Sequence, residues 1–185
     1  MTAFRFHFVL VAVLITCFAI SASAQKAPTF KQPVLLTSAG QSADVTMAST
    51  LLKKAKIEAL AKPLAQPADL KGIHTLIVVA GFSSKGLGAA GISREDEMNR
   101  VTTLLEAAKK AKIPVLTMHL GGAARRGSQS DDFNKVAAEA AAYLLIVKQG
   151  DEDSFFSSIA QEKKIPIEVV DKIAGAVAPL QSVIP

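Results

Sequence analysis

Three segments rich in glycine, hydroxyl and basic residues contain the side chains of this sequence that are best suited to binding a polar ligand. The first segment spans residues 37–44 and holds Ser38, Gly40, Gln41 and Ser42. Small residues and hydroxyl groups ahead of a helix let backbone amides point at an anion, which the helix dipole also attracts. The sequence therefore predicts a loop that binds an anion or another polar group. A turn that merely caps the helix is the alternative.

The second segment spans residues 81–91 and holds Ser83, Ser84, Lys85 and Gly86. It contains a Gly-x-Gly-x-x-Gly pattern, which in dinucleotide sites opens directly at a strand end and is followed by an acidic residue after the next strand. Here five residues separate the pattern from the preceding apolar run, and the next run ends near a histidine. We therefore expect a permissive loop that covers a ligand, or else a plain flexible connection.

The third segment places His119, Gly121, Gly122, Arg125 and Arg126 after another apolar run. An arginine offers a planar fork of donors that fits a carboxylate or phosphate group. Because glycines flank the pair, we expect one guanidinium to point inward and the other to stay in solvent or pair with an acid. The alternatives are a solvated surface pair and a histidine with a purely structural role.

The sequence contains few sets of residues that are suited to catalysis. Strand-end placement makes a triad of Ser83, His119 and Asp151 conceivable, but Ser83 lacks the closing glycine of a nucleophile elbow. Asp153 is more simply read as a helix cap. We assign no catalytic residue and predict neither a metal site nor a cofactor, since only two histidines and no cysteine follow the first 24 residues.

Short apolar runs alternate with helical patterns along the chain. The runs are rich in Val, Ile and Leu and do not alternate with polar residues, as is typical of strands buried on both faces of a parallel sheet. The expected strands are 34–37, 75–80, 115–120, 143–148 and 167–170, with a further short strand possible within 57–64, and the expected helices are 43–56, 93–112, 130–141, 153–163 and 171–178. In the clearest of these helices, Ser93 is the expected N-cap, with Asp96 three positions on.

This alternation predicts an α/β fold: a three-layer sandwich with a mostly parallel, about five-stranded, doubly wound sheet, flavodoxin-like or Rossmann-like. In such sheets, ligands bind beyond the carboxyl ends of the strands, where the strand order reverses. We therefore expect Gly40, Lys85, Arg125 and Asp151 to lie at one edge of the sheet.

Composition excludes several classes of protein. Of the 185 residues, 50% are hydrophobic and 20% are charged, which rules out a disordered chain, a collagen-like fibre and a disulfide-stapled miniprotein. The formal net charge is +5, an excess too small to mark a nucleic-acid binder. With no Trp and one Tyr, a binding surface of stacked aromatic rings is not expected either.

The first residues have the pattern of an export signal. Arg5 precedes an apolar stretch at 9–20, which is short for a membrane span, and Ala22-Ser23-Ala24 fits a cleavage site. We expect a signal peptide at 1–24, a polar lead-in at 25–32 and a single α/β domain at 33–185. The mature protein would then be periplasmic or secreted, without a membrane span and without Cys17. The alternatives are an uncleaved anchor and a lipoprotein modified at Cys17.

Four segments taken together resemble a family of exported bacterial proteins known as domain of unknown function 6305. They read LLTSAGQSADV, SSKGLGAAGISREDE, HLGGAARRGSQSD and DEDSFFSSIAQEKKIPI, and the resemblance covers residues 33–170. It implies an extracytoplasmic α/β protein and no established activity, so no catalytic residue is carried over from it.

These observations favour a non-enzymatic protein that binds a small anionic or zwitterionic molecule at the loops after its strands. Such a protein would serve a membrane transporter or a sensor, and nucleic acid is not an expected partner. The alternatives are an extracytoplasmic hydrolase or transferase that uses the same pocket, and a structural role.

Overall fold

The computed structural model describes residues 27–185, so the expected signal peptide lies outside the described part. A single six-stranded sheet forms the centre, with the strand order β2-β1-β3-β4-β5-β6 and all neighbours parallel. The strands are β1 (Val34–Ala39), β2 (Ala59–Ala61), β3 (Thr75–Ala80), β4 (Val115–His119), β5 (Tyr143–Val147) and β6 (Ile167–Val170). This confirms the predicted doubly wound α/β sheet, with one strand more than the five that the long apolar runs indicated.

The additional strand, β2, lies within the segment 57–64 in which a short strand was considered. It has three residues and pairs only with the first half of β1, from Val34 to Leu36. The four central strands are buried along their whole length, as their unbroken apolar sequences predicted.

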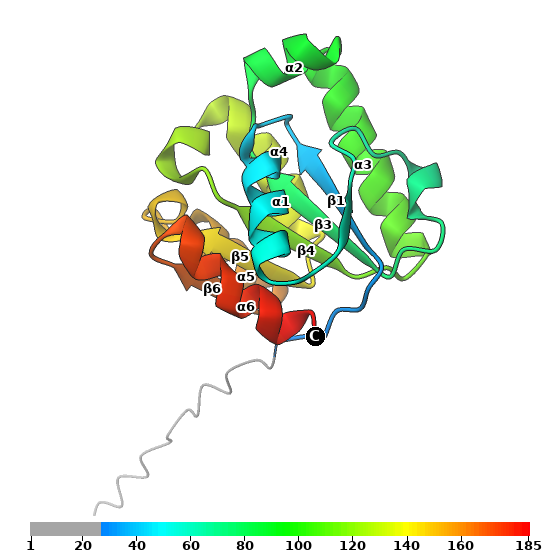
Figure 1. Ribbon diagram of the computed structural model, residues 1–185. Coiled ribbons are helices and arrows are strands. Elements are labelled where there is room, and N and C mark those ends of the chain that lie inside the picture. Colours follow the sequence, from blue (N-terminus) through cyan, green and yellow to red (C-terminus); the bar gives the residue numbers. More distant parts are fainter. Residues whose placement is uncertain (1–26) are drawn as a thin grey trace, which may run out of the picture.

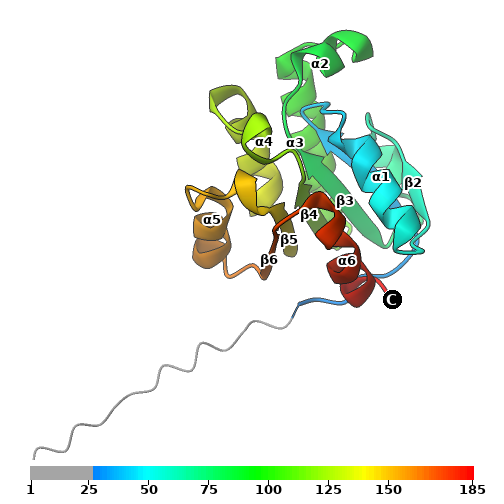
Figure 2. The ribbon, with the colours of Figure 1, turned by 60° about the vertical axis from the view of Figure 1, so that its left-hand side comes forward.

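Helices cover both faces of the sheet (Figures 1 and 2). One core cluster joins strand side chains to α1 (Asp44–Lys54) and α6 (Val177–Val183). Two others join the opposite side chains of the strands to α3 (Arg94–Lys110), α4 (Ser128–Glu139) and α5 (Phe155–Lys163). The molecule is therefore the expected three-layer sandwich. No helix within residues 27–185 has the length and apolar character needed to cross a membrane.

The helix termini follow the sequence signals in most places. The Ser93 hydroxyl accepts a hydrogen bond from the Asp96 amide, and the Asp96 carboxylate accepts one from the Ser93 amide, which confirms the predicted cap of α3. The helix expected at 171–178 is displaced: a 3₁₀ turn occupies Ile173–Ala176, and α6 begins after it.

The glycine-rich segment differs more from its prediction, because most of it is helical. Residues Ser84–Ala90 form α2, which stands beyond the sheet at the top of Figure 1. The Ser83 hydroxyl caps this helix by accepting a hydrogen bond from the Gly86 amide at 3.1 Å. Helix α2 therefore forms a regular wall at this edge of the sheet, in place of the expected flexible loop.

The strand order reverses direction between β1 and β3, and their following loops are in close contact. The Ser83 amide donates to the Gly40 carbonyl at 2.8 Å. Gly40 has a φ of +97°, and a Cβ built on it would lie 2.6 Å from the Gly81 carbonyl oxygen, so no larger residue fits this approach. Since all the strands are parallel, the predicted meeting of the four loops at one edge of the sheet is confirmed.

Candidate functional site

An open pocket of about 860 Å³ lies at the carboxyl ends of β1 and β3, where the strand order reverses. This is the position at which doubly wound sheets place their ligands. We call it the switch-point pocket. Its lining comes from the loop after β1, the start of α1, the segment after β2, helix α2 and one arginine: Gln41, Ser42, Ala43, Val45, Ala61, Lys62, Pro63, Leu64, Ser83, Lys85, Gly86, Ala89, Ala90 and Arg125.

The loop after β1 is held from behind by Glu97 of α3, whose side chain is fully buried. One carboxylate oxygen of Glu97 accepts hydrogen bonds from the Gly40 amide at 2.9 Å and from the Gln41 side-chain amide at 3.0 Å. The Gln41 amide group also donates to the Pro63 carbonyl at 3.0 Å. Glu97 and Gln41 thereby fix two walls of the pocket relative to each other.

Arg100 completes this support. Its guanidinium pairs with Glu97, with an Nε to Oε2 distance of 2.7 Å, and also donates to the carbonyls of Ser38 and Ala65. Neither Glu97 nor Arg100 was among the predicted site residues. The signal was nonetheless present: Glu97 occupies the stripe of α3 that continues through Val101 and Leu104, where an unpaired acid would not be tolerated.

Arg125 lines the switch-point pocket and contacts residues of the loops around it. Its Nε atom lies 3.5 Å from Asp44 Oδ2, and its Nη1 atom donates to the Phe82 carbonyl at 3.2 Å. The side chain retains 30% of its exposed area, whereas that of Asp44 retains 7%. Asp44 Oδ2 accepts no hydrogen bond from the described residues, so the ion pair with Arg125 is not reinforced by one.

Arg126 has a different environment. Its guanidinium bonds Asp131 and Asp153, each with a contact of 2.8 Å, and lies 4.3 Å from the centre of the Phe155 ring. Hydrogen bonding to Asp153 is the largest cause that raises the pKa of Arg126, and the same bond lowers the pKa of Asp153 to about 2. Arg125 lines the switch-point pocket beside the buried Asp44, whereas Arg126 is held by two acids, as was expected for one of the two arginines.

A second hollow, of about 580 Å³, adjoins the first and shares Ser83, Lys85 and Arg125 with it. We call it the hydroxyl pocket because Ser84, Ser128 and Ser130 also line it. The lining residues are Phe82, Ser83, Ser84, Lys85, Ala124, Arg125, Arg126, Gly127, Ser128, Gln129 and Ser130. Lys85 and Arg125 therefore mark the boundary between the two hollows.

The remaining predicted site residues line neither hollow. Ser38 is buried in β1, and its hydroxyl has no hydrogen-bond partner among the described residues. The Gly40 amide, which was expected to face an anion, donates to Glu97 instead. Gly121 and Gly122 form the turn that brings the chain back to Arg125. We leave these residues out of the proposed site.

His119 is fully buried behind the turn, with Nδ1 3.2 Å from the Ala80 carbonyl and Nε2 3.1 Å from the Gly122 carbonyl. Burial is the largest cause that lowers its pKa, although both carbonyl contacts raise it. No hydrogen bond joins His119 to Ser83 or Asp151 in the described part of the chain. Asp151 instead accepts hydrogen bonds from the amides of Phe156 and Ser157 at the start of α5.

The lowered pKa of His119 predicts that acid destabilises the protein. An unfolded histidine titrates near pH ~6.5. Below that pH the unfolded chain binds more protons than the folded chain, so the free energy of unfolding falls by up to about 1.4 kcal/mol per pH unit until the folded pKa is reached. Urea unfolding at pH values lowered stepwise from about 6.5 should show the free energy of unfolding falling, and His119→Asn should reduce this fall, whereas a substitution of the exposed His74 by Asn should not. The same fall in the wild type and in His119→Asn would show that another group is responsible.

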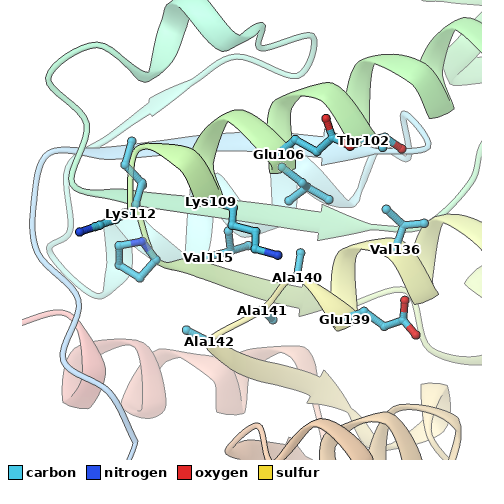
Figure 3. Close-up of a pocket in the computed structure, with 13 residues that line it drawn as sticks. Thr102, Glu106, Lys109, Lys112, Val115, Val136, Glu139, Ala140, Ala141 and Ala142 are labelled. Carbon is cyan, nitrogen blue, oxygen red and sulfur yellow. The ribbon is translucent and has the colours of Figure 1, made fainter.

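Another pocket, of about 590 Å³, lies at the opposite edge of the sheet (Figure 3). Figure 3 shows Glu106 and Lys109 on α3 and Glu139 on α4, with the alanines of residues 140–142 beside them. Lys112 also contributes, so two acids and two lysines surround this pocket and give it no preference for either sign of charge. None of the predicted site residues lies there.

Fold and site together define a doubly wound α/β protein with an open, cationic pocket at its switch point. The chain belongs to the family described as Domain of unknown function (DUF6305), whose family model matches residues 31–184. No curated protein matches the sequence.

Among solved structures, a GDSL-like lipase from Bacteroides thetaiotaomicron VPI-5482 is 11% identical, with 74% of this chain and 66% of that chain covered at a TM-score of 0.35. The SGNH-hydrolase family esterase AlinE4 is 14% identical, with 86% and 84% covered at a TM-score of 0.30. At these identities and TM-scores, neither likeness bears on what this chain binds or catalyses.

Proposed function

We propose that this protein binds a small anionic or zwitterionic molecule in the switch-point pocket. The observation that carries the proposal is the position of Lys85 and Arg125, one from helix α2 and one from the turn after β4, which line the same pocket at the edge where doubly wound sheets bind their ligands.

The local charge supports an anion over a cation. Lys85 is exposed and makes no ion pair with any residue of 27–185. Lys62, at the opposite wall, pairs with Asp69 at 2.7 Å and contributes less. The Asp44 carboxylate lies beside Arg125, but it is buried and does not line the pocket. The pocket therefore presents more positive than negative charge to a ligand.

Binding also accounts for the site better than hydrolysis does. Ser42 and Ser83 place hydroxyl groups at the pocket, but Ser83 already accepts a hydrogen bond from the Gly86 amide. No histidine lines the pocket, and both ring nitrogens of His119 face backbone carbonyls. A hydroxyl without a general base beside it is a weak nucleophile, so we assign the serines to ligand contact.

The protein is proposed to work outside the cytoplasm, where it would deliver its ligand to a membrane transporter or sensor. The leader expected at 1–24 supports the location, and sequencing the N-terminus of the mature protein tests it. A mature chain that begins at Gln25 is the expected result, and one that retains the leader would contradict it.

Calorimetric titration with acetate and with inorganic phosphate tests the site directly. A charge-assisted hydrogen bond contributes about 1.5–3 kcal/mol, so Arg125→Ala should weaken anion binding by about ten- to a hundredfold. Arg125→Lys should restore part of the loss, because it keeps the charge but not the planar fork.

The matched control is Arg94→Ala, which removes a surface arginine paired with Asp132 on α4. It should leave anion affinity unchanged. Equal affinity in the wild type and in Arg125→Ala would refute the proposed site.

A further inference from the structure

The two hollows on either side of Lys85 and Arg125 differ in chemistry. Besides the two cations, the switch-point pocket is lined largely by apolar residues, with Lys62 among them: Val45, Ala61, Pro63, Leu64, Ala89 and Ala90. The hydroxyl pocket is lined by more polar residues, which include Ser84, Arg126, Ser128, Gln129 and Ser130. A ligand whose anionic group lies at Lys85 and Arg125 must extend into one of the two hollows. The hollow that it enters determines the chemical class of the rest of the ligand.

The apolar surface is the better receptor. The Leu64 residue is 38% exposed, and large hydrophobic residues with such exposure are few within residues 27–185. Covering its side chain would remove apolar area from water, which is favourable in proportion to the area covered. Leu64, which follows β2, lines the same pocket as the small residues Ala89 and Ala90 of α2, so an alkyl chain in this pocket has apolar partners on both segments.

The hydroxyl pocket offers less to a polar ligand than its composition suggests. The Ser83 hydroxyl oxygen accepts from the Gly86 amide at 3.1 Å, and the Ser130 hydroxyl oxygen accepts from the Phe82 amide at 3.3 Å. Arg126 is engaged by two aspartates. Several polar groups there already have partners within the protein, so a polyhydroxylated ligand would gain few new hydrogen bonds.

From this asymmetry we infer that the ligand is a short-chain monocarboxylate with an alkyl tail, whose tail lies between Leu64 and α2. The inference rests on the proposed function, since the carboxylate is placed at Lys85 and Arg125. The inference adds the chemical nature of the rest of the ligand, which is a saturated hydrocarbon chain rather than a sugar.

Calorimetry with acetate, butyrate, hexanoate and octanoate tests the inference, with gluconate as a probe that matches hexanoate in charge and carbon number. Each buried methylene group should tighten binding by up to about fourfold, so hexanoate should bind up to about sixteenfold tighter than butyrate. Gluconate should bind more weakly than hexanoate. Equal affinity along the series, or tighter binding of gluconate, overturns the inference while leaving the anion site intact.

Two variants locate the tail. Ala90→Leu should fill the apolar groove and remove most of the gain in affinity from acetate to hexanoate. Leu64→Ser, at an exposed position with little bearing on folding, should also lower the gain per methylene group. Ala140→Leu is the control, because it fills the pocket at the opposite edge in the same way.

The outcomes separate the two proposals. If no carboxylate binds the wild type, the proposed function fails and the inference fails with it. If acetate binds and Ala140→Leu, rather than Ala90→Leu, weakens hexanoate, the tail lies at the other pocket and the inference alone is overturned.

Discussion

Replacing Arg100 with alanine should lower the free energy of unfolding by about 3–5 kcal/mol, the usual cost of leaving a buried charge without its partner. Glu97 is fully buried, and Arg100 supplies two of the donors to its carboxylate. The remaining donors, the amides of Gly40 and Gln41, are neutral and cannot balance the charge. Urea unfolding monitored by circular dichroism measures the loss.

The double variant Glu97→Gln, Arg100→Met distinguishes a charge effect from lost packing. Glutamine keeps an oxygen acceptor for Gly40, and methionine fills much of the arginine volume, so the double variant should be markedly more stable than Arg100→Ala. If both proteins lose the same stability, the unpaired charge is not the cause. A surface pair such as Arg94 with Asp132 should cost at most about 1 kcal/mol when broken.

Gly86→Ala should destabilise the protein by about 1–3 kcal/mol or more, as expected for an atom forced into a packed site. A Cβ built on Gly86 would lie 1.8 Å from the Gln41 carbonyl oxygen, so either α2 or the loop after β1 must move. Both form walls of the switch-point pocket. Anion affinity should therefore fall together with stability.

Gly88→Ala is the matched control on the same helix. A Cβ there meets nothing within 4 Å, and the residue is exposed within α2. Alanine should stabilise the helix by up to about 1 kcal/mol relative to glycine and leave anion affinity unchanged. Equal destabilisation by both substitutions would mean that helix propensity, and not the contact with Gln41, decides the result.

The fold was predictable because its strands are buried on both faces. Runs such as Thr75–Ala80 contain no alternation, and in a chain of alternating strands and helices this indicates a parallel sheet. Strand β2 carried a much weaker signal, since it has three residues and is partly exposed. Helix α2 was not predicted because its glycines lower the intrinsic helix propensity of the segment. The cap at Ser83 and the packing of the helix against the Gln41 backbone compensate for this low propensity.

The site was predictable only in part. The sequence indicates on which loop a side chain lies, but it does not show which other residues will form hydrogen bonds or ion pairs with that side chain. Arg125 and Arg126 are adjacent and chemically identical, and their different environments depend on their partners. Arg125 lies beside Asp44, whereas Arg126 pairs with Asp131 of α4 and with Asp153, which precedes α5. His119 stands at a strand end, as a ligand residue would, but the turn at Gly122 covers it. Glu97 and Arg100 lie on a helix far along the chain from the loop that they hold.

Mapping of amide chemical shifts by NMR during a titration with hexanoate tests the anion site most directly. The amides of Gln41, Ser42, Ser83, Lys85 and Arg125 should shift together and saturate, because these residues surround the switch-point pocket. Hexylamine, which has the same chain and the opposite charge, should leave them unmoved. Shifts confined to residues 140–142 at the opposite edge, no shifts at all, or the same shifts with hexylamine would contradict anion binding at this site.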